Sequence, residues 1–363
     1  MKPHTLFALP ALFGLAHLMA SLVSATPAAT TPSSTPAAVS AIGESTNAIL
    51  QGDSARAVAA LRQVPAGQFS PGDADYRRCM VARYERSSPE LAFETPVDGF
   101  VRDLLGEYQA YWWRALAQPA RASEEESQLL ARLHALLGDT AAGAEWDAVE
   151  TLITRRLESL GFHAQLGRTP PLRDLMVWGR HEVKMFAVTL PDESVQNVPV
   201  ALLDDFASRG WSYYARCGRG SSGGWATEDT VFAVRPWYPD LESDPFRASL
   251  LGHESQHFAD KQRYENLADW ELEYRAKLTE LWMARDSAAD LLDKLTRSQG
   301  DNPASPHTYA NRRVLHDLAD TLRRSGTPAE ADHLATVAPE KLRKAAQSTL
   351  QADTARRTPL AKR

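Results

Sequence analysis

The first half of the chain repeats apolar residues at helical spacing. In residues 101–116, 124–137 and 144–160 apolar side chains recur three and four positions apart, so each segment is predicted to form a helix. Residues 47–61 hold two short apolar stretches on either side of Gly52, which predicts a helical hairpin. The aromatic residues of the 101–116 segment fall on its apolar face, so we expect them in the core rather than in a ligand site.

A different pattern occupies the middle of the chain. Residues 183–190 are rich in β-branched and apolar side chains and end at Pro191, and residues 230–234 form a second such run, so both are predicted to be strands. Residues 198–202 fit either a short strand or the start of a helix. After Asp244 the helical spacing returns almost to the end of the chain. The sequence therefore predicts an α+β protein that is predominantly α-helical, with a small β-sheet between two helical regions.

The N-terminal 41 residues differ from the rest in composition. Lys2 precedes a long apolar run, and Val23-Ser24-Ala25 matches a small-x-small cleavage site, so residues 1–25 are predicted to be a secretory signal peptide. The alternative is an uncleaved membrane anchor. Residues 26–41 contain only Ala, Thr, Pro, Ser and Val, which predicts a flexible linker. We expect a helical N-terminal region over residues 42–165, a secreted or periplasmic location, and no transmembrane segment after signal cleavage.

The composition narrows the class of protein. Of the 363 residues 44% are hydrophobic and 24% are charged, which argues against a largely disordered chain or a multi-pass membrane protein. The net charge of −6 and the lack of a long basic stripe argue against nucleic acid as a partner. Cys79 and Cys217 are too few for a disulfide scaffold or a cysteine zinc cluster. In an exported protein they can form one disulfide or remain separate thiols, and the sequence leaves both open.

One pentapeptide carries candidate chemistry: His253-Glu254-Ser255-Gln256-His257 has the form H-E-x-x-H. Asp244 is a favourable helix N-cap and Pro245 a favourable first helical residue. A helix is therefore predicted from Pro245 through the motif to about Lys261. We expect the motif on a well-capped helix of an exported protein rather than in a loop.

The spacing of the motif suits a metal site. Residues four apart lie on one helix face, so His253 and His257 can bind one metal ion. Phe246 and Leu250 continue this face with apolar side chains, which directs the histidines toward the interior. Glu254 projects beside the pair and can reach a water on the metal without being a ligand. The alternative is a pair of core histidines satisfied by hydrogen bonds.

With these residues the chain resembles the zincin metallopeptidases, whose active-site helix carries H-E-x-x-H and whose third ligand lies further along the chain. The metzincin branch takes that ligand from H-x-x-G-x-x-H, and the residues after His257 lack the required Gly and His. The gluzincin branch takes a Glu from a following helix, often within E-x-x-A, and Glu273-Tyr274-Arg275-Ala276 fits this form. Glu271 is the rival third ligand, and Glu280 is the least favoured of the three candidates.

This gluzincin-like resemblance, which covers only about residues 230–280, implies a zinc site. His253, His257 and Glu273 would bind Zn²⁺. Glu254 would be the general base for a metal-activated water that hydrolyses a peptide bond. A further donor would stabilise the oxyanion, and the candidates, with His307 and Tyr309 first, are Tyr264, Arg275, His307, Tyr309 and His316.

Two functions compete. The first is an exported zinc metallopeptidase that acts on peptides or proteins. In that case residues 166–363 would form a zincin-like metallopeptidase region, in which a small sheet precedes the motif helix and the strand at 230–234 lies at the sheet edge to pair with substrate. The second is a non-catalytic envelope binding or assembly protein on a zincin-like fold. In either case the helical N-terminal region can bind a protein partner.

Overall fold

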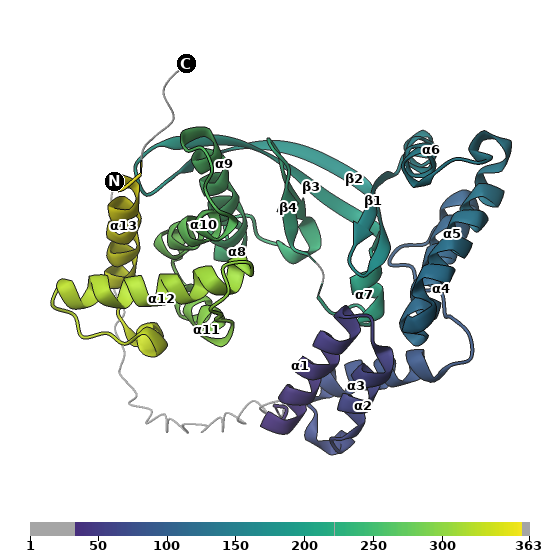
Figure 1. Cartoon of the computed structure of the whole chain (residues 1–363), viewed down its shortest axis with the longest axis horizontal. Coiled ribbons are helices and arrows are strands. Elements are labelled where there is room, and N and C mark those ends of the chain that lie inside the picture. The colour runs from purple at the N-terminus through teal and green to yellow at the C-terminus, as the bar shows by residue number, and fades with distance from the viewer. Residues whose placement is uncertain (1–32, 221, 358–363) are drawn as a thin grey trace, which may run out of the picture.

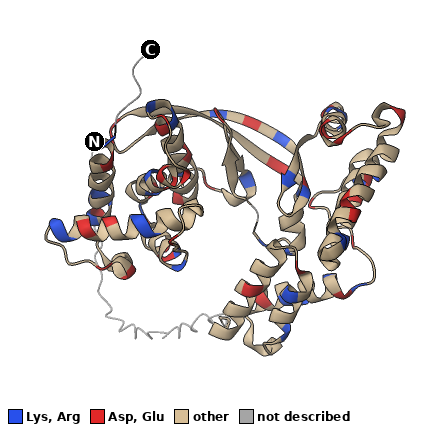
Figure 2. Ribbon diagram, viewed as in Figure 1, with Lys and Arg blue, Asp and Glu red and all other residues tan. Residues whose placement is uncertain are grey.

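The structure is a computed structural model that describes residues 33–220 and 222–357. It has two helical lobes joined by a long curved sheet (Figure 1). The predicted α+β architecture, mainly helical, is confirmed. The predicted signal peptide lies outside the described residues. Within the described ranges no helix is both long and apolar enough to span a bilayer. Acidic and basic residues intermingle on both lobes (Figure 2).

The N-terminal lobe contains the helices that the apolar pattern predicts. Helices α1 and α2 pack side by side as the predicted hairpin, and α4 to α6 match the three predicted segments. The bounds are α1 (Pro36–Leu50), α2 (Ser54–Arg62), α3 (Pro71–Glu85), α4 (Gly99–Ala117), α5 (Ala122–Leu137) and α6 (Trp146–Ser159). The side chains predicted to form the core of α4 are fully buried, namely Leu104, Leu105, Tyr108, Tyr111 and Trp112.

Helix α1 begins inside the segment predicted to be a flexible linker. The Ala38 amide donates to the Thr35 hydroxyl (3.3 Å), and Pro36 is the first helical residue. Ala38 and Ala41 are buried. The linker prediction is therefore wrong for residues 36–41. Alanine favours a helix and lets it pack closely, but a stretch of Ala, Ser and Val gives no apolar periodicity from which the helix can be recognised.

The sheet lies between the two lobes and has the strand order β1-β2-β3-β5-β4. Strands β1, β2 and β3 pair antiparallel in series, β5 pairs parallel to β3, and β4 pairs antiparallel to β5. The predicted strands are confirmed within β2 and β5, and residues 198–202 belong to β3. The bounds are β1 (His163–Thr169), β2 (Leu172–Thr189), β3 (Val195–Arg209), β4 (Gly224–Ala226) and β5 (Val231–Val234).

Strand β5 lies inside the sheet, so the prediction that residues 230–234 form its edge is wrong. Its outer neighbour is β4, in which Trp225 pairs with Phe232. The approach is close, because a Cβ on Gly224 would come within 2.3 Å of the Phe232 carbonyl oxygen. A three-residue strand that follows a glycine-rich loop has no periodic pattern, which is why sequence reasoning missed it.

The C-terminal lobe packs its motif helix against one face of the sheet. Val200 and Leu202 of β3 and Val231 of β5 share a buried cluster with Phe258 of that helix. The helices are α8 (Asp244–Phe246), α9 (His253–Arg263), α10 (Asp269–Met283), α11 (Ala288–Arg297), α12 (Pro306–Arg324) and α13 (Pro339–Ala355). The sheet therefore fixes the position of the helix that carries the histidines.

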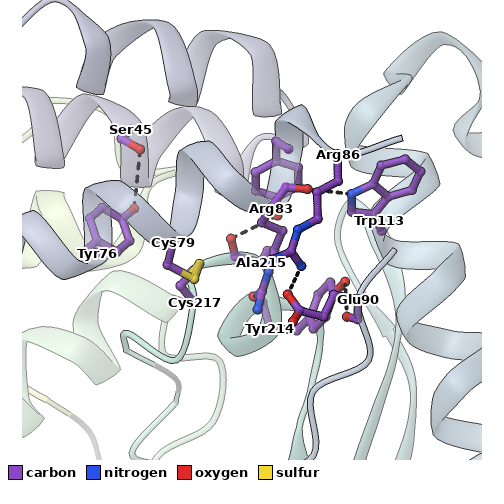
Figure 3. Close-up of a disulfide and its surroundings, with 11 residues drawn as sticks. Ser45, Tyr76, Cys79, Arg83, Arg86, Glu90, Trp113, Tyr214, Ala215 and Cys217 are labelled. Carbon is purple, nitrogen blue, oxygen red and sulfur yellow. Dashed lines mark hydrogen bonds and ion pairs between the residues drawn. A yellow bond between two sulfur atoms is a disulfide. The ribbon is translucent and has the colours of Figure 1, made fainter. Parts of the chain in front are cut away.

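A disulfide fastens the N-terminal lobe to the end of the sheet (Figure 3). Cys79 of α3 is bonded to Cys217, which follows the short helix α7 (Trp211–Ala215). The Arg83 guanidinium lies 4.3 Å from the centre of the Tyr214 ring. The sequence left the pairing of the two cysteines open, and the structure has them joined.

Candidate metal centre

The H-E-x-x-H motif follows directly on a change in helical winding. Helix α8 leads into a π-helical segment, η5 (Arg247–Gly252), and α9 begins at His253. The predicted helix from Pro245 to about Lys261 is therefore present, but it is not a single α-helix. The i→i+5 hydrogen bonds of a π-helix rotate the side chains that follow relative to those of a regular α-helix, and such segments occur frequently at functional sites.

Asp244 does not cap this helix as predicted. The N-cap position is occupied by Ser243. The Asp244 carboxylate instead accepts hydrogen bonds from the backbone amides of Arg285, Asp286 and Ser287, at 2.7, 2.7 and 2.9 Å. Helix α11 begins directly afterwards, so Asp244 organises the entry to a helix distant in sequence, and local capping rules do not reveal such a contact.

Helix α10 brings an acidic residue to the motif because it lies very close to η5 and α9. A Cβ on Gly252 would come within 2.3 Å of the Met283 sulfur, so a larger residue there would displace the Met283 side chain. The Thr279 hydroxyl donates to the Gln256 side-chain oxygen (2.7 Å). Ala276 is fully buried, as expected for the small residue of E-x-x-A.

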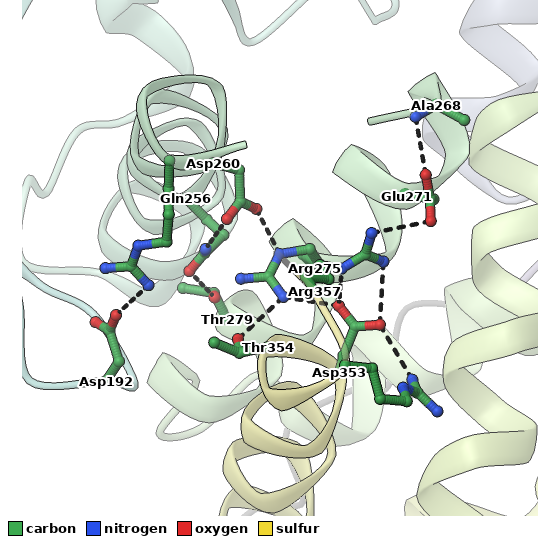
Figure 4. Close-up of polar contacts among 12 residues, drawn as sticks. Asp192, Gln256, Asp260, Ala268, Glu271, Arg275, Thr279, Asp353, Thr354 and Arg357 are labelled. Atoms are coloured by element: carbon green, nitrogen blue, oxygen red, sulfur yellow. Dashed lines mark hydrogen bonds and ion pairs between the residues drawn. The ribbon is translucent and has the colours of Figure 1, made fainter. Parts of the chain in front are cut away.

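A buried ion network ties the same two helices to α13 (Figure 4). Arg275, with a side chain only 1% exposed, pairs with Asp260 of α9 at 2.8 Å and with Asp353 of α13 at 2.7 Å. Arg357 pairs with Asp353 at 2.6 Å and with Glu271 at 3.0 Å. The network fixes α9 and α10 relative to each other, and therefore also the donors that they carry.

The donor atoms of His253, His257 and Glu273 converge on one point, and this group can hold a metal ion. His253 Nε2 lies 3.1 Å from His257 Nε2. Glu273 oxygens lie 3.7 Å from His253 Nε2 and 3.5 Å from His257 Nε2. Ligand atoms about 2.0–2.1 Å from a tetrahedral zinc ion are about 3.3–3.4 Å apart, so the three distances fit a common ion of this size.

The cluster leaves polar atoms without complete partners. Within the described ranges, the buried atoms His257 Nδ1 and Glu273 Oε2 have no hydrogen bond of regular geometry. Two cationic or polar groups lie near Glu273 Oε2, namely His307 Nδ1 at 2.8 Å and Lys277 Nζ at 3.3 Å. His307 and Lys277 therefore partner the Glu273 carboxylate from within the chain, and His257 Nδ1 is the buried atom of the cluster left without a partner in the described part of the chain.

The charges around the cluster shift the pKa values of His253 and Glu273. Burial would lower the pKa of His253, but the carboxylates of Glu273 and Glu280 outweigh burial and raise it to about 9. Burial would raise the pKa of Glu273, but His253, His257 and His307 hold it far below its usual range. Without a metal the cluster therefore holds a proton on His253, and a metal ion would take the place of that proton.

Glu280 contacts the other nitrogen of His253. Its Oε2 lies 3.6 Å from His253 Nδ1, while His253 Nε2 faces the donor cluster. From the sequence, Glu280 was the least favoured of the three candidates for the third ligand. The geometry instead makes it a carboxylate that orients the imidazole from behind, which is the usual partner of a metal-bound histidine.

The rival third ligand, Glu271, lies outside the cluster. Its carboxylate accepts from the Ala268 amide at 2.9 Å and pairs with Arg357 at 3.0 Å. Glu271 belongs to the first turn of α10, where its carboxylate caps the helix and stabilises its positive end.

Sequence reasoning missed Tyr238, a buried residue between β5 and α8. Burial raises the pKa of Tyr238 to about 12, and the negative charges of Glu254 and Glu280 add to this shift. The Tyr238 hydroxyl is therefore protonated at neutral pH and lies within electrostatic reach of both acids. A lone tyrosine in an irregular segment carries no signal by which the sequence could have identified it.

Of the candidates for the oxyanion donor, only His307 contacts the cluster, through Glu273. Arg275 is engaged with two aspartates, and its guanidinium also lies 5.2 Å from the Tyr264 ring centre. The Tyr309 ring packs edge-on against Trp270, and His316 is exposed on α12. The structure thus brings one of the five proposed residues to the donors.

The architecture and the site were compared with known proteins in three ways. Comparison of the chain with models of protein families, with curated protein sequences and with solved structures finds no match. The geometry of the donor cluster is therefore the basis for a functional conclusion.

Proposed function

We propose that the protein is an exported zinc-dependent peptidase. The observation that carries the proposal is the convergence of His253, His257 and Glu273 at distances that one tetrahedral ion spans. Two imidazoles with one carboxylate suit zinc better than magnesium or calcium, which prefer oxygen ligands. Three protein ligands leave one position open, which is typical of a catalytic rather than a structural site.

The residues around the cluster support hydrolysis. A zinc ion held there would polarise a carbonyl and acidify a water molecule. Glu254 follows the first histidine directly, and it would take the proton of the attacking water and pass it to the leaving amine. The Tyr238 hydroxyl, which stays protonated, would donate a hydrogen bond to the oxyanion, with His307 as the alternative donor.

The edge of the sheet offers a place for an extended substrate. Strand β4 has only one partner within the described part of the chain, so its outer edge can pair with a peptide in the manner of an added strand. A Cβ on Gly223, directly before β4, would come within 2.5 Å of the Tyr238 hydroxyl. A peptide paired with β4 would therefore run beside Tyr238, whose pKa is raised in part by the charge of Glu254.

Export and the zincin-like relationship belong to the same proposal. The Cys79–Cys217 disulfide supports an oxidising compartment, in agreement with the predicted signal peptide. The packing of a sheet against the motif helix, followed by a helix with an E-x-x-A acid, supports a gluzincin-like arrangement. The N-terminal lobe, joined to the sheet by the disulfide, would bind a partner or guide substrate.

The proposal is tested first by metal content. Elemental mass spectrometry of the purified protein is expected to give about one zinc per chain, and His253→Ala and Glu273→Gln are expected to lose it. Glu271→Gln is the matched control, because it removes an acid from the same helix outside the cluster. Retention of zinc in Glu273→Gln would contradict the assigned third ligand, and a metal-free wild type would contradict the metal site.

Catalysis is tested separately with Glu254→Gln. This variant is expected to keep its zinc and to lose peptidase activity by at least about a hundred-fold, because it cannot accept the proton of water. If wild type and variant both bind zinc and neither cleaves a library of unstructured peptides, the non-catalytic binding or assembly function is favoured instead.

A further inference from the structure

A cavity in the C-terminal lobe lies apart from the donor cluster. It has a volume of about 510 Å³ and lies between the end of β2, segment η5, the end of α10 and α13. Its floor is apolar, with Val188 and Leu251 almost fully buried and Trp282 and Met283 beside them. A cavity of this size and lining is typical of a site for a small molecule.

The rim of this cavity is basic. Arg285, Arg343 and Lys344 line it with exposed side chains, and no partner for these three charges is found in the described part of the chain. A fourth cation, Arg247, lies 3.5 Å from Glu242. Three cations at the rim therefore remain without an ion-pair partner within the described residues.

The acids at the rim do not cancel this charge. Glu242 is 72% exposed in its side chain and faces Arg247. Asp244 is already held by three backbone amides and by the Ser287 hydroxyl, which donates at 3.0 Å. Four cations and two acids line the cavity, and both acids already have partners within the chain.

The segments outside the described residues carry no acidic side chain. Residues 1–32 and 358–363, which lie outside the description, contain no Asp or Glu, and the only charged side chains among them are basic. Neither segment therefore matches a basic rim. The matching occupant is a separate molecule with a negative charge.

We propose that this cavity binds an amphiphilic anion, a molecule with a carboxylate or phosphate head and an apolar body. The head would lie among Arg285, Arg343 and Lys344, and the apolar body would cover Val188, Leu251 and Met283. Arginine and lysine are suited to both kinds of head group. The charges would supply the selection of anions, and contact with the partly exposed Trp282 and Met283 would add apolar burial.

The site is distinct from the donor cluster and does not depend on the proposed peptidase activity. None of His253, His257 and Glu273 lines the cavity. The two sites adjoin through η5, since Leu251 lines the cavity and Gly252, its neighbour, packs on Met283. Ligand binding can therefore be measured whether or not a metal is present.

The test is calorimetric titration of the purified protein with octanoate and with octyl phosphate, and with octyl glucoside as the neutral counterpart. We expect one molecule of an anionic probe per chain, bound at least about ten-fold more tightly than octyl glucoside and more weakly at high salt. The preferred head group distinguishes a carboxylate from a phosphate ligand. Equal binding of the neutral probe, or no saturable binding of either anion, would overturn the proposal.

Four variants locate the binding. Arg343→Gln and Lys344→Gln are expected to weaken binding about five-fold each, as for the loss of one charge contact near the surface. Lys341→Gln is the matched control, because Lys341 is an exposed cation of the same helix that does not line the cavity. His253→Ala is expected to bind as wild type does, which excludes a carboxylate bound to the metal centre. An equal effect of Lys341→Gln and Lys344→Gln, or loss of binding in His253→Ala, would contradict this location.

Discussion

Helix α10 carries two groups of buried charge that face different sides of the same lobe. Glu273 faces the two histidines of α9, whereas Arg275 faces Asp260 of α9 and Asp353 of α13 (Figure 4). Each group joins α10 to α9. The Arg275 group is almost closed to solvent, whereas the side chains of the histidine group are 12–14% exposed. They differ in how completely their polar atoms are paired.

The Arg275 group is complete. The guanidinium has two aspartate partners and also donates to the Thr354 hydroxyl at 3.1 Å. Asp260 accepts in addition from Gln256 at 2.9 Å. Each charge in this group has an opposite charge as partner within the chain, which is the condition under which buried ions persist as part of a structure.

The histidine group is incomplete. Its three donors point at one another, and Glu273 Oε2 and His257 Nδ1 lack regular hydrogen bonds within the residues described. Protonation of His253 compensates the carboxylates in part. The comparison teaches that buried charge alone does not identify a site. The distinguishing feature is the convergence of three donor atoms on one point, where a single cation can bind all of them.

The largest expected effect follows from breaking the complete group. Arg275→Met leaves Asp260 and Asp353 buried without their common partner, so the free energy of unfolding is expected to fall by about 3–5 kcal/mol. Urea denaturation of the metal-depleted protein measures this loss. The control is Arg297→Met, which removes an arginine paired with Asp293 on an exposed helix face and is expected to cost less than about 0.5 kcal/mol. A loss below about 1 kcal/mol in Arg275→Met would show that the network does not stabilise the lobe.

A smaller effect is expected when the histidine group loses the carboxylate that contacts the outer nitrogen of His253. Glu280→Gln removes the carboxylate beside His253 Nδ1 and is expected to lower zinc affinity about 10–100-fold, while the stability of the metal-depleted protein changes little. Competition with a chelator of known affinity measures the change. Glu265→Gln, an exposed acid between α9 and α10, is the matched control. Unchanged affinity in Glu280→Gln would show that this acid does not orient the imidazole.

The histidine group could be predicted from the sequence because its geometry is local. Four-residue spacing sets His253 and His257 on one face, and the E-x-x-A pattern singled out Glu273 over Glu271. The first prediction depends on helical periodicity, which is visible within a few residues, and the second depends on the resemblance to the gluzincin branch. The position of Glu280 was not predicted, although it lies two helical turns after Glu273, because its role depends on how α10 crosses α9.

The features that sequence reasoning missed depend on contacts between distant segments. Asp244 was predicted to cap its own helix but binds the amides before α11, and β5 lies inside the sheet because β4 covers its edge. The π-helical winding of η5 accompanies the close packing of Gly252 on Met283. Partner identity in such contacts is set by the tertiary fold, so local propensity cannot supply it.

The smallest expected effect concerns the pH dependence of the complete group. Burial would raise the pKa of Asp353, but hydrogen bonds and charges from Arg357 and Arg275 outweigh burial and lower it. A carboxyl group whose folded pKa lies below its unfolded value stabilises the fold above about pH 4, and this contribution is lost as the pH falls further. The free energy of unfolding of the metal-depleted wild type is therefore expected to fall below about pH 4, and more shallowly in Asp353→Asn. Urea denaturation between about pH 3 and pH 6 measures both curves, and parallel curves would mean that the charge of Asp353 contributes nothing to the stability of this lobe.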